Sequence, residues 1–411
     1  MADLYYNIKN YGNPIALIDH WNNKSERYAI WDFEEIFFFN HTGININGKY
    51  ILGDPLSLLQ KKIDEWKQTS SDIAAIGGVS YDFKNHLFPH LNLKKISSNF
   101  PYIWFGKPKK VISYDLNLSS NKKKFPSLNL IKDIPNIDCY KRSIYKIKEH
   151  ICNGDTYQIN FTNPKTYELN ESPLDFYLKA RDIICPYYGF YLDIGNYQIL
   201  SFSPERFFNK TNDVIESLPM KGTNARSKNL EKDKILAQEL FNSEKDRAEH
   251  LMIVDLIRND LGKICEYGSI KVENLFGIQS FKTVHQMVTK VLGKLNKQIK
   301  EIDILSALFP GGSITGAPKE RSIEIIDSIE NYQRKIYTGA LGYIKSNGDM
   351  DFNIAIRTML VDNNQCEYPV GGGIIFDSET LSEWNEAQQK GKIIDQFTKK
   401  NHKIIKESPN A

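Results

Sequence analysis

One lysine and one glutamate stand where their side chains could do chemistry together. Lys221 lies in the segment Pro219-Met-Lys-Gly-Thr223, and Glu205 precedes it by about one hairpin length. The residues between them alternate as two short strands around a polar turn, which predicts a β-hairpin over 206–220. Because a hairpin brings its ends together, we expect Glu205 and Lys221 to lie near each other. The stretch alone leaves open whether they form a salt bridge or a catalytic pair.

Glycines mark three places where a ligand could approach the backbone. Gly222 follows Lys221 directly, and the run Gly371-Gly372-Gly373 suits a close approach or a turn at a strand end. The segment 309–319 is not a phosphate loop, because Gly316 is followed by Ala-Pro-Lys rather than Lys-Ser/Thr. It still indicates an anion site, since Ser313 and Thr315 add hydroxyls and a helix predicted over 319–329 would point its N-terminus at the ligand.

Acidic side chains recur in two pairs, each with a spacing of three residues. Asp246 and Glu249 lie in a helix predicted over 245–265, and Glu383 and Glu386 lie in a second helical segment near the C-terminus. Residues three apart share one face of a helix. Carboxylates without neighbouring Cys or His suit a hard cation such as Mg²⁺. The alternative for each pair is an ordinary solvated helix face.

Composition places the chain among globular proteins and gives no electrostatic case for nucleic acid. The chain has 411 residues, 41% of them hydrophobic and 25% charged, with a formal net charge of +3. Its five cysteines are scattered without metal-binding spacing, which favours free thiols in a reducing compartment. We find no secretory signal and no apolar run long enough to span a bilayer, so we expect a cytoplasmic protein.

The elements that must position these side chains divide the chain in two. Residues 1–135 should form a β-rich region that supplies a sheet and completes the fold around the rest of the chain. It shows no recognised site chemistry, has a helix near 55–67 and ends in a linker near 116–135. Residues 136–405 are expected to form the catalytic domain. It should begin with a helix through Tyr140 and Ile151, followed by a strand in which Gln158 belongs to the polar face.

Taken together, these stretches resemble the chorismate-utilising enzymes. The resemblance runs from about residue 137 to 392 and includes, in order, the following stretches: Gly154-Asp-Thr-Tyr-Gln-Ile-Asn, Ser203-Pro-Glu205, the Lys221 segment, Lys245-Asp-Arg-Ala-Glu249, Val284-His285, the loop at 311–319, Tyr337-Thr-Gly-Ala, Ile356-Arg357-Thr, the three glycines and the Glu383/Glu386 helix. It implies an α/β (α+β) fold in which two antiparallel β-sheets pack face to face with helices outside. The site would lie in the cleft between them.

The resemblance also implies a role for each candidate residue. Lys221 would attack the chorismate ring as its 4-hydroxyl leaves, and Glu205 would be the general acid for that hydroxyl. Mg²⁺ would be bound directly by Glu249 and Glu386, with Asp246 and Glu383 close by. The residues implied in holding or surrounding the substrate are Gln158, Gly222, Thr223, His285, Ser313, Thr315, Tyr337, Arg357, Gly371, Gly372, Gly373 and Lys390.

Two positions separate the chemistries within this family. Members that activate water carry Lys where this chain has Gln158, so Gln158 favours ammonia as the nucleophile. Members that form anthranilate usually carry Ala in place of Lys221, and their N-terminal Leu-Leu-Glu-Ser motif is absent here. The resemblance therefore implies amination of chorismate to 4-amino-4-deoxychorismate, on the route to para-aminobenzoate and folate. Formation of anthranilate, or chorismate binding without turnover, remains the alternative. Since no glutaminase segment is evident, ammonia would come from a separate glutamine amidotransferase subunit.

That chemistry places a demand on the two side chains. A free lysine has a pKa of about 10.4, so its amine is almost entirely protonated at neutral pH. Removal from water would lower the pKa of Lys221, whereas an ionised Glu205 would raise it. We therefore expect Glu205 to be protonated when substrate is bound, which a general acid also requires.

Overall fold

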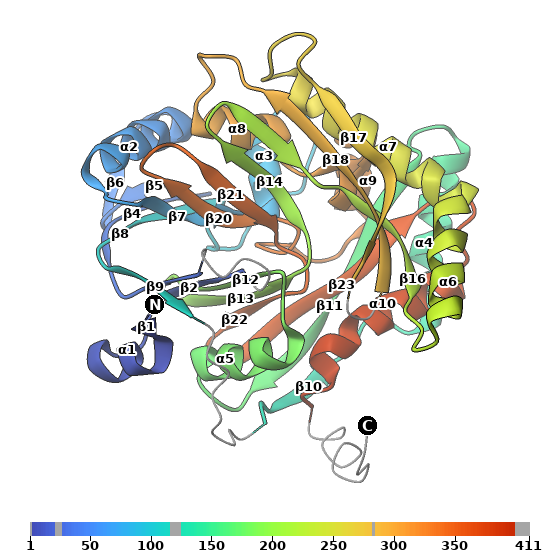
Figure 1. The fold of residues 1–411 in the computed structure, drawn as a ribbon, viewed down its shortest axis with the longest axis horizontal. Coiled ribbons are helices and arrows are strands. Elements are labelled where there is room, and N and C mark those ends of the chain that lie inside the picture. The colour runs from blue at the N-terminus through green and yellow to red at the C-terminus, as the bar shows by residue number, and fades with distance from the viewer. Residues whose placement is uncertain (1, 21–26, 116–124, 282–283, 399–411) are drawn as a thin grey trace.

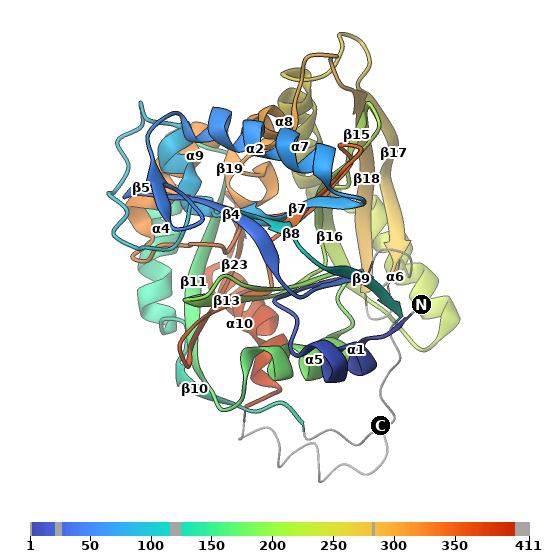
Figure 2. The same cartoon turned by 90° about the vertical axis from the view of Figure 1, so that its left-hand side faces the viewer.

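Two β-sheets lie face to face in the computed structural model, which describes residues 2–20, 27–115, 125–281 and 284–398. Within these residues the first sheet has 11 strands and the second has 12. Strand pairs are antiparallel, except that β1 runs parallel to β9. Helices cover the outer surfaces of both sheets (Figures 1 and 2). The predicted fold class is confirmed.

The first sheet combines strands from both ends of the chain. Its order is β1 (Ala2–Asp3), β9 (Val111–Asp115), β3 (Arg27–Ile30), β2 (Ala16–Asp19), β12 (Tyr188–Asp193), β13 (Tyr197–Ser203), β22 (Thr358–Asp362), β23 (Gln365–Ile374), β11 (Gln158–Leu169) and β10 (Leu128–Lys132), with β19 (Gly316–Ala317) beside β11.

The second sheet also combines strands from both ends of the chain. Its order is β16 (Met220–Ala225), β18 (Val284–Lys294), β15 (Val214–Ser217), β14 (Arg206–Thr211), β21 (Met350–Ile354), β20 (Ala340–Lys345), β7 (Ile73–Val79), β8 (Ile103–Pro108), β4 (Phe33–Asn40), β5 (Gly43–Ile46) and β6 (Lys49–Ile51), with β17 (Lys271–Ser280) beside β18. The hairpin predicted over 206–220 is confirmed as β14 and β15, in which Asn209 pairs with Glu216.

The helices agree well with the sequence patterns. They are α1 (Leu4–Tyr11), α2 (Pro55–Thr69), α3 (Lys84–Leu87), α4 (Ile137–Cys152), α5 (Pro173–Ile184), α6 (Leu230–Asn242), α7 (Glu244–Gly262), α8 (Glu301–Leu308), α9 (Lys319–Ile329) and α10 (Thr380–Asp395). The helices expected near 55–67, through Tyr140, over 245–265 and over 319–329 are all present. Side-chain caps begin several of them, such as Asp54 at α2 and Ser243 at α7.

Alternating side chains divide the interior into layers. In β2, Ile18 packs between the two sheets with Ile76 of β7 and Leu341 of β20, while Leu17 points to the other face and packs with Tyr177 of α5. Successive strand residues point to opposite faces, so one strand serves two cores. A third core lies between the second sheet and helices α2, α7 and α8. The layers are therefore helix, sheet, sheet, helix.

The two regions expected from sequence share both sheets. β7 from the N-terminal region lies between β8 and β20, and Val79 pairs with Ala340. β2 likewise pairs with β12. The proposed division at residue 135 stays a prediction about independent folding, and residues 116–124 of the expected linker and 399–405 of the expected catalytic domain lie outside the described residues.

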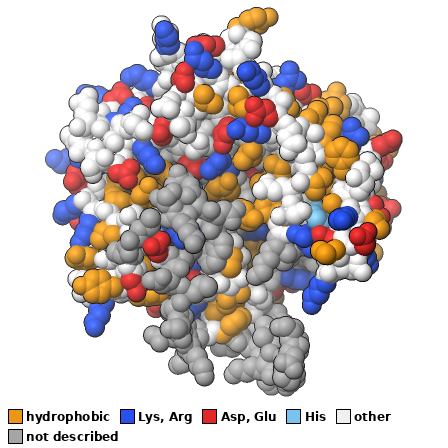
Figure 3. Space-filling model, viewed as in Figure 1, with side chains coloured by type: hydrophobic (Ala, Val, Ile, Leu, Met, Phe, Trp, Pro, Cys, Tyr) orange, Lys and Arg blue, Asp and Glu red, His pale blue; other side chains and the backbone are white. Residues whose placement is uncertain are grey.

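Three further expectations from the sequence concern surface charge, free thiols and membrane-spanning segments. On the face drawn in Figure 3, basic and acidic side chains are interspersed rather than gathered by sign. All five cysteines are described, and each is a free thiol, as expected. None of the helices in the described ranges is long and apolar enough to cross a membrane.

Candidate active site

A β-bulge in β16 sets the position of Lys221. Lys221 pairs with Met287 of β18 and Thr223 pairs with Gln286, so Gly222 is an extra residue in the strand. Gly222 has a φ of +71°, and a Cβ there would lie 3.0 Å from Oδ1 of Asp246. A bulge bends its strand and redirects neighbouring side chains. The glycine therefore permits both the strand geometry and the close approach of α7.

Gly373 of β23 leaves room directly beside the Lys221 amine. A Cβ on Gly373 would lie 3.0 Å from Nζ of Lys221 and 2.9 Å from Nε2 of Gln158. Gln158 is completely buried, and neither of its amide atoms has a hydrogen-bond partner among the described residues. A buried amide without partners costs free energy. Its donor and acceptor are thus available to a ligand beside Lys221.

Glu205 lies just before β14 and is nearly buried. Ser313 of the glycine-rich loop donates a hydrogen bond to its Oε1 at 3.2 Å. Burial raises the pKa of Glu205 to about 7, against the opposing effects of the Ser313 hydrogen bond and the charges of Lys221 and Arg357. A carboxyl group with such a pKa can hold and release a proton near neutral pH.

The Lys221 amine is biased in the complementary direction. Burial lowers its pKa, while the carboxylate of Glu249, with Oε2 at 4.0 Å from Nζ, acts in the opposite sense. The charge of Lys390 adds to the lowering. Lys221 and Glu205 form no ion pair with each other in the part of the chain that is described. The salt-bridge interpretation of this pair is therefore not supported, although each charge influences the other's pKa.

Four carboxylates from α7 and α10 lie near Lys221 or the neighbouring glycines: Glu249 near Lys221, Asp246 near Gly222, and Glu383 and Glu386 near Gly372. Glu386 accepts a hydrogen bond from Nζ of Lys390 at 2.6 Å, and Glu383 accepts one from Ser378 at 2.7 Å. Burial raises the pKa of Glu249 and of Glu383, and in both cases the charge of Glu386 adds to the rise. A cation bound among these groups would relieve that repulsion.

The donor chemistry fits Mg²⁺, because Asp246, Glu249, Glu383 and Glu386 offer only oxygen. As the side chains stand, no three His, Cys, Asp or Glu residues within the described ranges converge tightly enough to hold a metal ion. One oxygen of the Glu386 carboxylate, Oε1, is paired with Lys390. The magnesium assignment stays a prediction.

The three glycines of β23 lie between the Lys221 amine and the carboxylates of α10. The carbonyl oxygen of Gly371 accepts a hydrogen bond from Lys390 at 2.8 Å. A Cβ on Gly372 would lie 3.2 Å from Oε1 of Glu386 and 3.4 Å from Nζ of Lys390. Side chains at 372 and 373 would thus crowd the candidate site, whereas bare backbone leaves space for a ligand.

Arg357 lies close enough to Glu205 and to Tyr337 for its charge to influence both of their pKa values. Arg357 has a φ of +50°, a left-handed conformation that few non-glycine residues adopt. Its charge opposes the rise that burial imposes on the pKa of Glu205 and on the pKa of Tyr337. Thr223 is exposed beyond the bulge. These residues remain predictions as substrate contacts.

Two predicted residues use their side chains elsewhere. Thr315 is fully buried and donates to the carbonyl oxygen of Gly311 at 2.9 Å, so it braces the glycine-rich loop. His285 lies 3.0 Å from Asp233 of α6 through Nε2 and 2.9 Å from Ser280 through Nδ1. In this arrangement both hydroxyl and imidazole support the elements around the site rather than open toward a ligand.

The sequence reasoning assigned no role to two further residues. The charge of Lys245, in the first turn of α7, opposes the rise in the pKa of Glu249 and of Glu383 and adds to the lowering of the pKa of Glu386. His250 is buried with Nε2 2.6 Å from Thr289, and burial and the charge of Lys221 lower its pKa to about 4. The position of Lys245, four residues before Glu249, was a usable signal; the partner of His250 was not visible from sequence.

Comparisons with known proteins agree on one family. A sequence profile described as chorismate binding enzyme matches residues 20–396. Anthranilate synthase component 1 of Saccharolobus solfataricus is 34% identical over 361 residues, which are 83% of this chain and 85% of that protein. Aminodeoxychorismate synthase component 1 of Bacillus subtilis is 39% identical over 253 residues, 62% of this chain but only 54% of that protein.

Solved structures extend the likeness to the fold. The crystal structure of anthranilate synthase component I from Streptococcus pneumoniae TIGR4 superposes with a TM-score of 0.79 at 27% sequence identity. The superposition covers 89% of this chain and 91% of that one. The relatives thus bear the names of two different enzymes, anthranilate synthase and aminodeoxychorismate synthase.

Proposed function

The chain belongs to the chorismate binding enzyme family, and from this premise we propose that it aminates chorismate to 4-amino-4-deoxychorismate. The observation that carries the proposal is the placement of the Lys221 amine. Its nitrogen lies beside bare backbone at Gly373 and the unpaired amide of Gln158, with its pKa lowered, while the pKa of Glu205 in the same site is raised to about 7.

The two side chains divide the work of the reaction. Neutral Lys221 forms a C–N bond to the ring, and the 4-hydroxyl leaves as water with a proton from Glu205. Ammonia then forms its own C–N bond, and Lys221 departs as the free amine. Overall, chorismate and ammonia give 4-amino-4-deoxychorismate and water. Gln158 can accept a hydrogen bond from ammonia through Oε1.

The cation and the partner belong to the same proposal. Glu249 and Glu386, with Asp246 and Glu383 nearby, would hold Mg²⁺, which supplies positive charge for a substrate carboxylate. A separate glutamine amidotransferase subunit would supply ammonia. The product would serve para-aminobenzoate and folate synthesis.

Product identification tests the proposal directly. The chain is incubated with chorismate, Mg²⁺ and an ammonium salt, and the products are identified by mass spectrometry. We expect 4-amino-4-deoxychorismate from the native chain, and with Lys221→Ala a loss of turnover of roughly a thousandfold, because no other amine can form the adduct. Lys290→Ala, which removes a half-exposed lysine paired with Glu216 on the neighbouring strand, should leave turnover unchanged. Glutamine without the partner subunit should give no product.

A second candidate function is formation of anthranilate. Two of the relatives described above, from Saccharolobus solfataricus and Streptococcus pneumoniae, are named anthranilate synthase and are matched over 83% and 89% of this chain. Release of anthranilate and pyruvate in the same incubation would favour it and would contradict the proposed amination. Binding of chorismate without any product would instead favour a non-catalytic binding subunit.

A further inference from the structure

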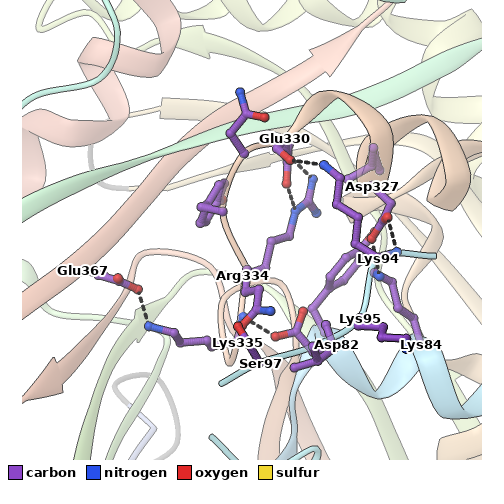
Figure 4. A pocket seen from close by; sticks show the side chains of 16 residues that line it. Asp82, Lys84, Lys94, Lys95, Ser97, Asp327, Glu330, Arg334, Lys335 and Glu367 are labelled. Carbon is purple, nitrogen blue, oxygen red and sulfur yellow. Dashed lines mark hydrogen bonds and ion pairs between the residues drawn. The ribbon is translucent and has the colours of Figure 1, made fainter. Parts of the chain in front are cut away.

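A cavity of about 520 Å³ lies outside the candidate active site. One side is formed by residues 81–97, which follow β7, and the other by residues 326–335, which end α9 and continue beyond it (Figure 4). Glu367 of β23 completes the rim. The volume falls in the usual range for small-molecule sites, so the lining decides what could bind.

Most charged groups in this lining neutralise one another. Lys84 pairs with Asp327 at 2.9 Å, and Lys335 pairs with Glu367 at 3.0 Å. Arg334 is buried, and its guanidinium donates to both carboxylate oxygens of Glu330. These pairs need no ligand.

Two buried polar groups in the lining are incompletely satisfied. The carboxylate of Asp82, whose residue is 4% exposed, accepts one hydrogen bond, from the backbone N–H of Lys335 at 3.1 Å. Its other oxygen has no hydrogen bond or ion pair among the described residues. The hydroxyl of Tyr81 is likewise buried without a partner in the described ranges. Burial raises the pKa of Asp82 to about 6, against the opposing charges of Lys84, Lys335 and Arg334 and the backbone hydrogen bond from Lys335. At neutral pH its second oxygen is therefore mainly an ionised acceptor without a hydrogen-bond donor.

Two lysines of the same cavity, Lys94 and Lys95, lack a carboxylate partner among the described residues. Nζ of Lys94 donates to the backbone carbonyl of Glu330 at 3.0 Å rather than to a carboxylate. Lys95 has no acidic partner in the part of the chain that is described, and both lysines line the cavity. In Figure 4 the Lys94 side chain reaches toward Glu330 on the opposite wall, whereas Lys95 lies beside Asp82 and Lys84. Among the described residues, the cavity thus offers two lysines without a carboxylate partner and one carboxylate oxygen without a hydrogen-bond donor.

The cavity walls also support two segments of the candidate site. Glu330 accepts hydrogen bonds from the backbone N–H and the hydroxyl of Thr162, which pairs with Gly371 across β11 and β23. Arg334 donates to the carbonyl oxygen of Ile314, the residue after Ser313. A ligand in the cavity would therefore touch residues that hold both segments.

We propose that this cavity binds a small acid that also carries a hydrogen-bond donor, either a hydroxyl or an ammonium group. Its anionic group is held by Lys94 and Lys95, and its donor binds the free oxygen of Asp82. The binding does not depend on which chorismate reaction the chain performs.

Calorimetric titration of the full chain tests this assignment with three probes. L-malate and L-aspartate each carry two carboxylates and one donor, whereas succinate carries the same carboxylates without the donor. Since a hydrogen bond to a charged acceptor is worth about tenfold or more in affinity, we expect at least one donor-bearing acid to bind about tenfold more tightly than succinate. The hydroxyl and ammonium forms are distinguished by which of the two binds more tightly.

Variants place the binding in the cavity. Asp82→Asn should reduce the preference for the donor-bearing acid to about threefold or less, and Lys94→Gln with Lys95→Gln, both exposed, should weaken all probes about tenfold. Lys109→Gln, an exposed lysine paired with Asp32, and Arg357→Gln in the candidate active site should leave binding unchanged. The proposal is overturned if no probe binds below ~10 mM, if succinate binds as well as the others, if the double lysine variant binds normally, or if Arg357→Gln abolishes binding.

Discussion

At the scale of residues, Lys221 and Glu205 need opposite protonation states from the same environment. The attacking amine must be neutral, and the general acid must carry a proton. Burial removes water from both groups and therefore disfavours both charges, which lowers the pKa of Lys221 and raises that of Glu205 to about 7. One physical cause thus prepares both partners for the proposed chemistry.

The first prediction concerns pH. Glu205 is protonated below its pKa of about 7, so kcat/KM should fall about tenfold per pH unit above that value. Lys221 is protonated at low pH, so kcat/KM should also fall toward acid, below its lowered pKa. The resulting bell-shaped profile is measured with saturating ammonium at each pH. A rate that stays flat from pH 6 to 9 would contradict the roles of both groups.

At the scale of elements, β23 combines two kinds of glycine in one run. A Cβ on Gly371 would lie 2.0 Å from the backbone oxygen of Phe161 in β11, inside the sheet. A Cβ on Gly373 would instead meet the ends of the Gln158 and Lys221 side chains. The same substitution along one strand should therefore have different effects on stability and on activity.

A matched pair of variants tests this difference. Gly373→Ala should lower kcat/KM by about 10- to 100-fold while changing the free energy of unfolding by less than about 1 kcal/mol, because flexible side-chain ends can move. Gly371→Ala should cost about 2 kcal/mol or more, because backbone cannot move away. Denaturant unfolding and steady-state kinetics on both variants give the comparison. Equal losses of stability in the two would remove the distinction.

Helices α7 and α10 allow a test of the proposed cation. Adding Mg²⁺ at ~100-fold its Kd should stabilise the chain by about 2.7 kcal/mol and raise Tm by a few degrees. EDTA should abolish turnover. Glu249→Gln and Glu386→Gln should lose the thermal response, whereas Asp255→Asn, an exposed residue of α7 paired with Arg258, should keep it. An unchanged Tm in native chain with and without Mg²⁺ would argue against a magnesium site among these carboxylates.

The sequence predicted local elements well but did not predict geometry that depends on distant strands. The helix over Lys319–Ile329 and the β14–β15 hairpin follow from neighbouring residues, and both are present with the predicted bounds or pairing. The family resemblance indicated which side chains belong to the site around Lys221. Neither approach predicted the bulge at Gly222 or the unpaired Gln158 amide, because both depend on strands that are far apart in the sequence.

At the scale of the whole molecule, the N-terminal region is built into both sheets rather than appended to them. All seven residues of β7 are buried between β8 and β20. Removing residues 1–135 would expose one edge of β20 and strip the core between the sheets of Ile18 and Ile76. Exposed edges and lost apolar contacts both oppose folding.

The corresponding prediction is that residues 136–411 alone do not fold. Their thermal scan by circular dichroism should show no cooperative transition, and they should not convert chorismate. Co-expression with residues 1–135 should restore both, because the missing strands are then supplied in trans. A cooperative transition in the isolated fragment would instead establish the catalytic domain as an independent unit.

The pairing of Val79 with Ala340 has a consequence for the newly made polypeptide. At roughly 5–20 residues per second, translation of the intervening stretch occupies on the order of 15–50 s. Throughout that delay β7 has emerged from the ribosome and can pair with β8, but its other neighbour, β20, has not yet been made. A nascent chain with such an open apolar border is a natural client for a chaperone, and its yield in a cell should depend on how well that border is shielded until synthesis ends.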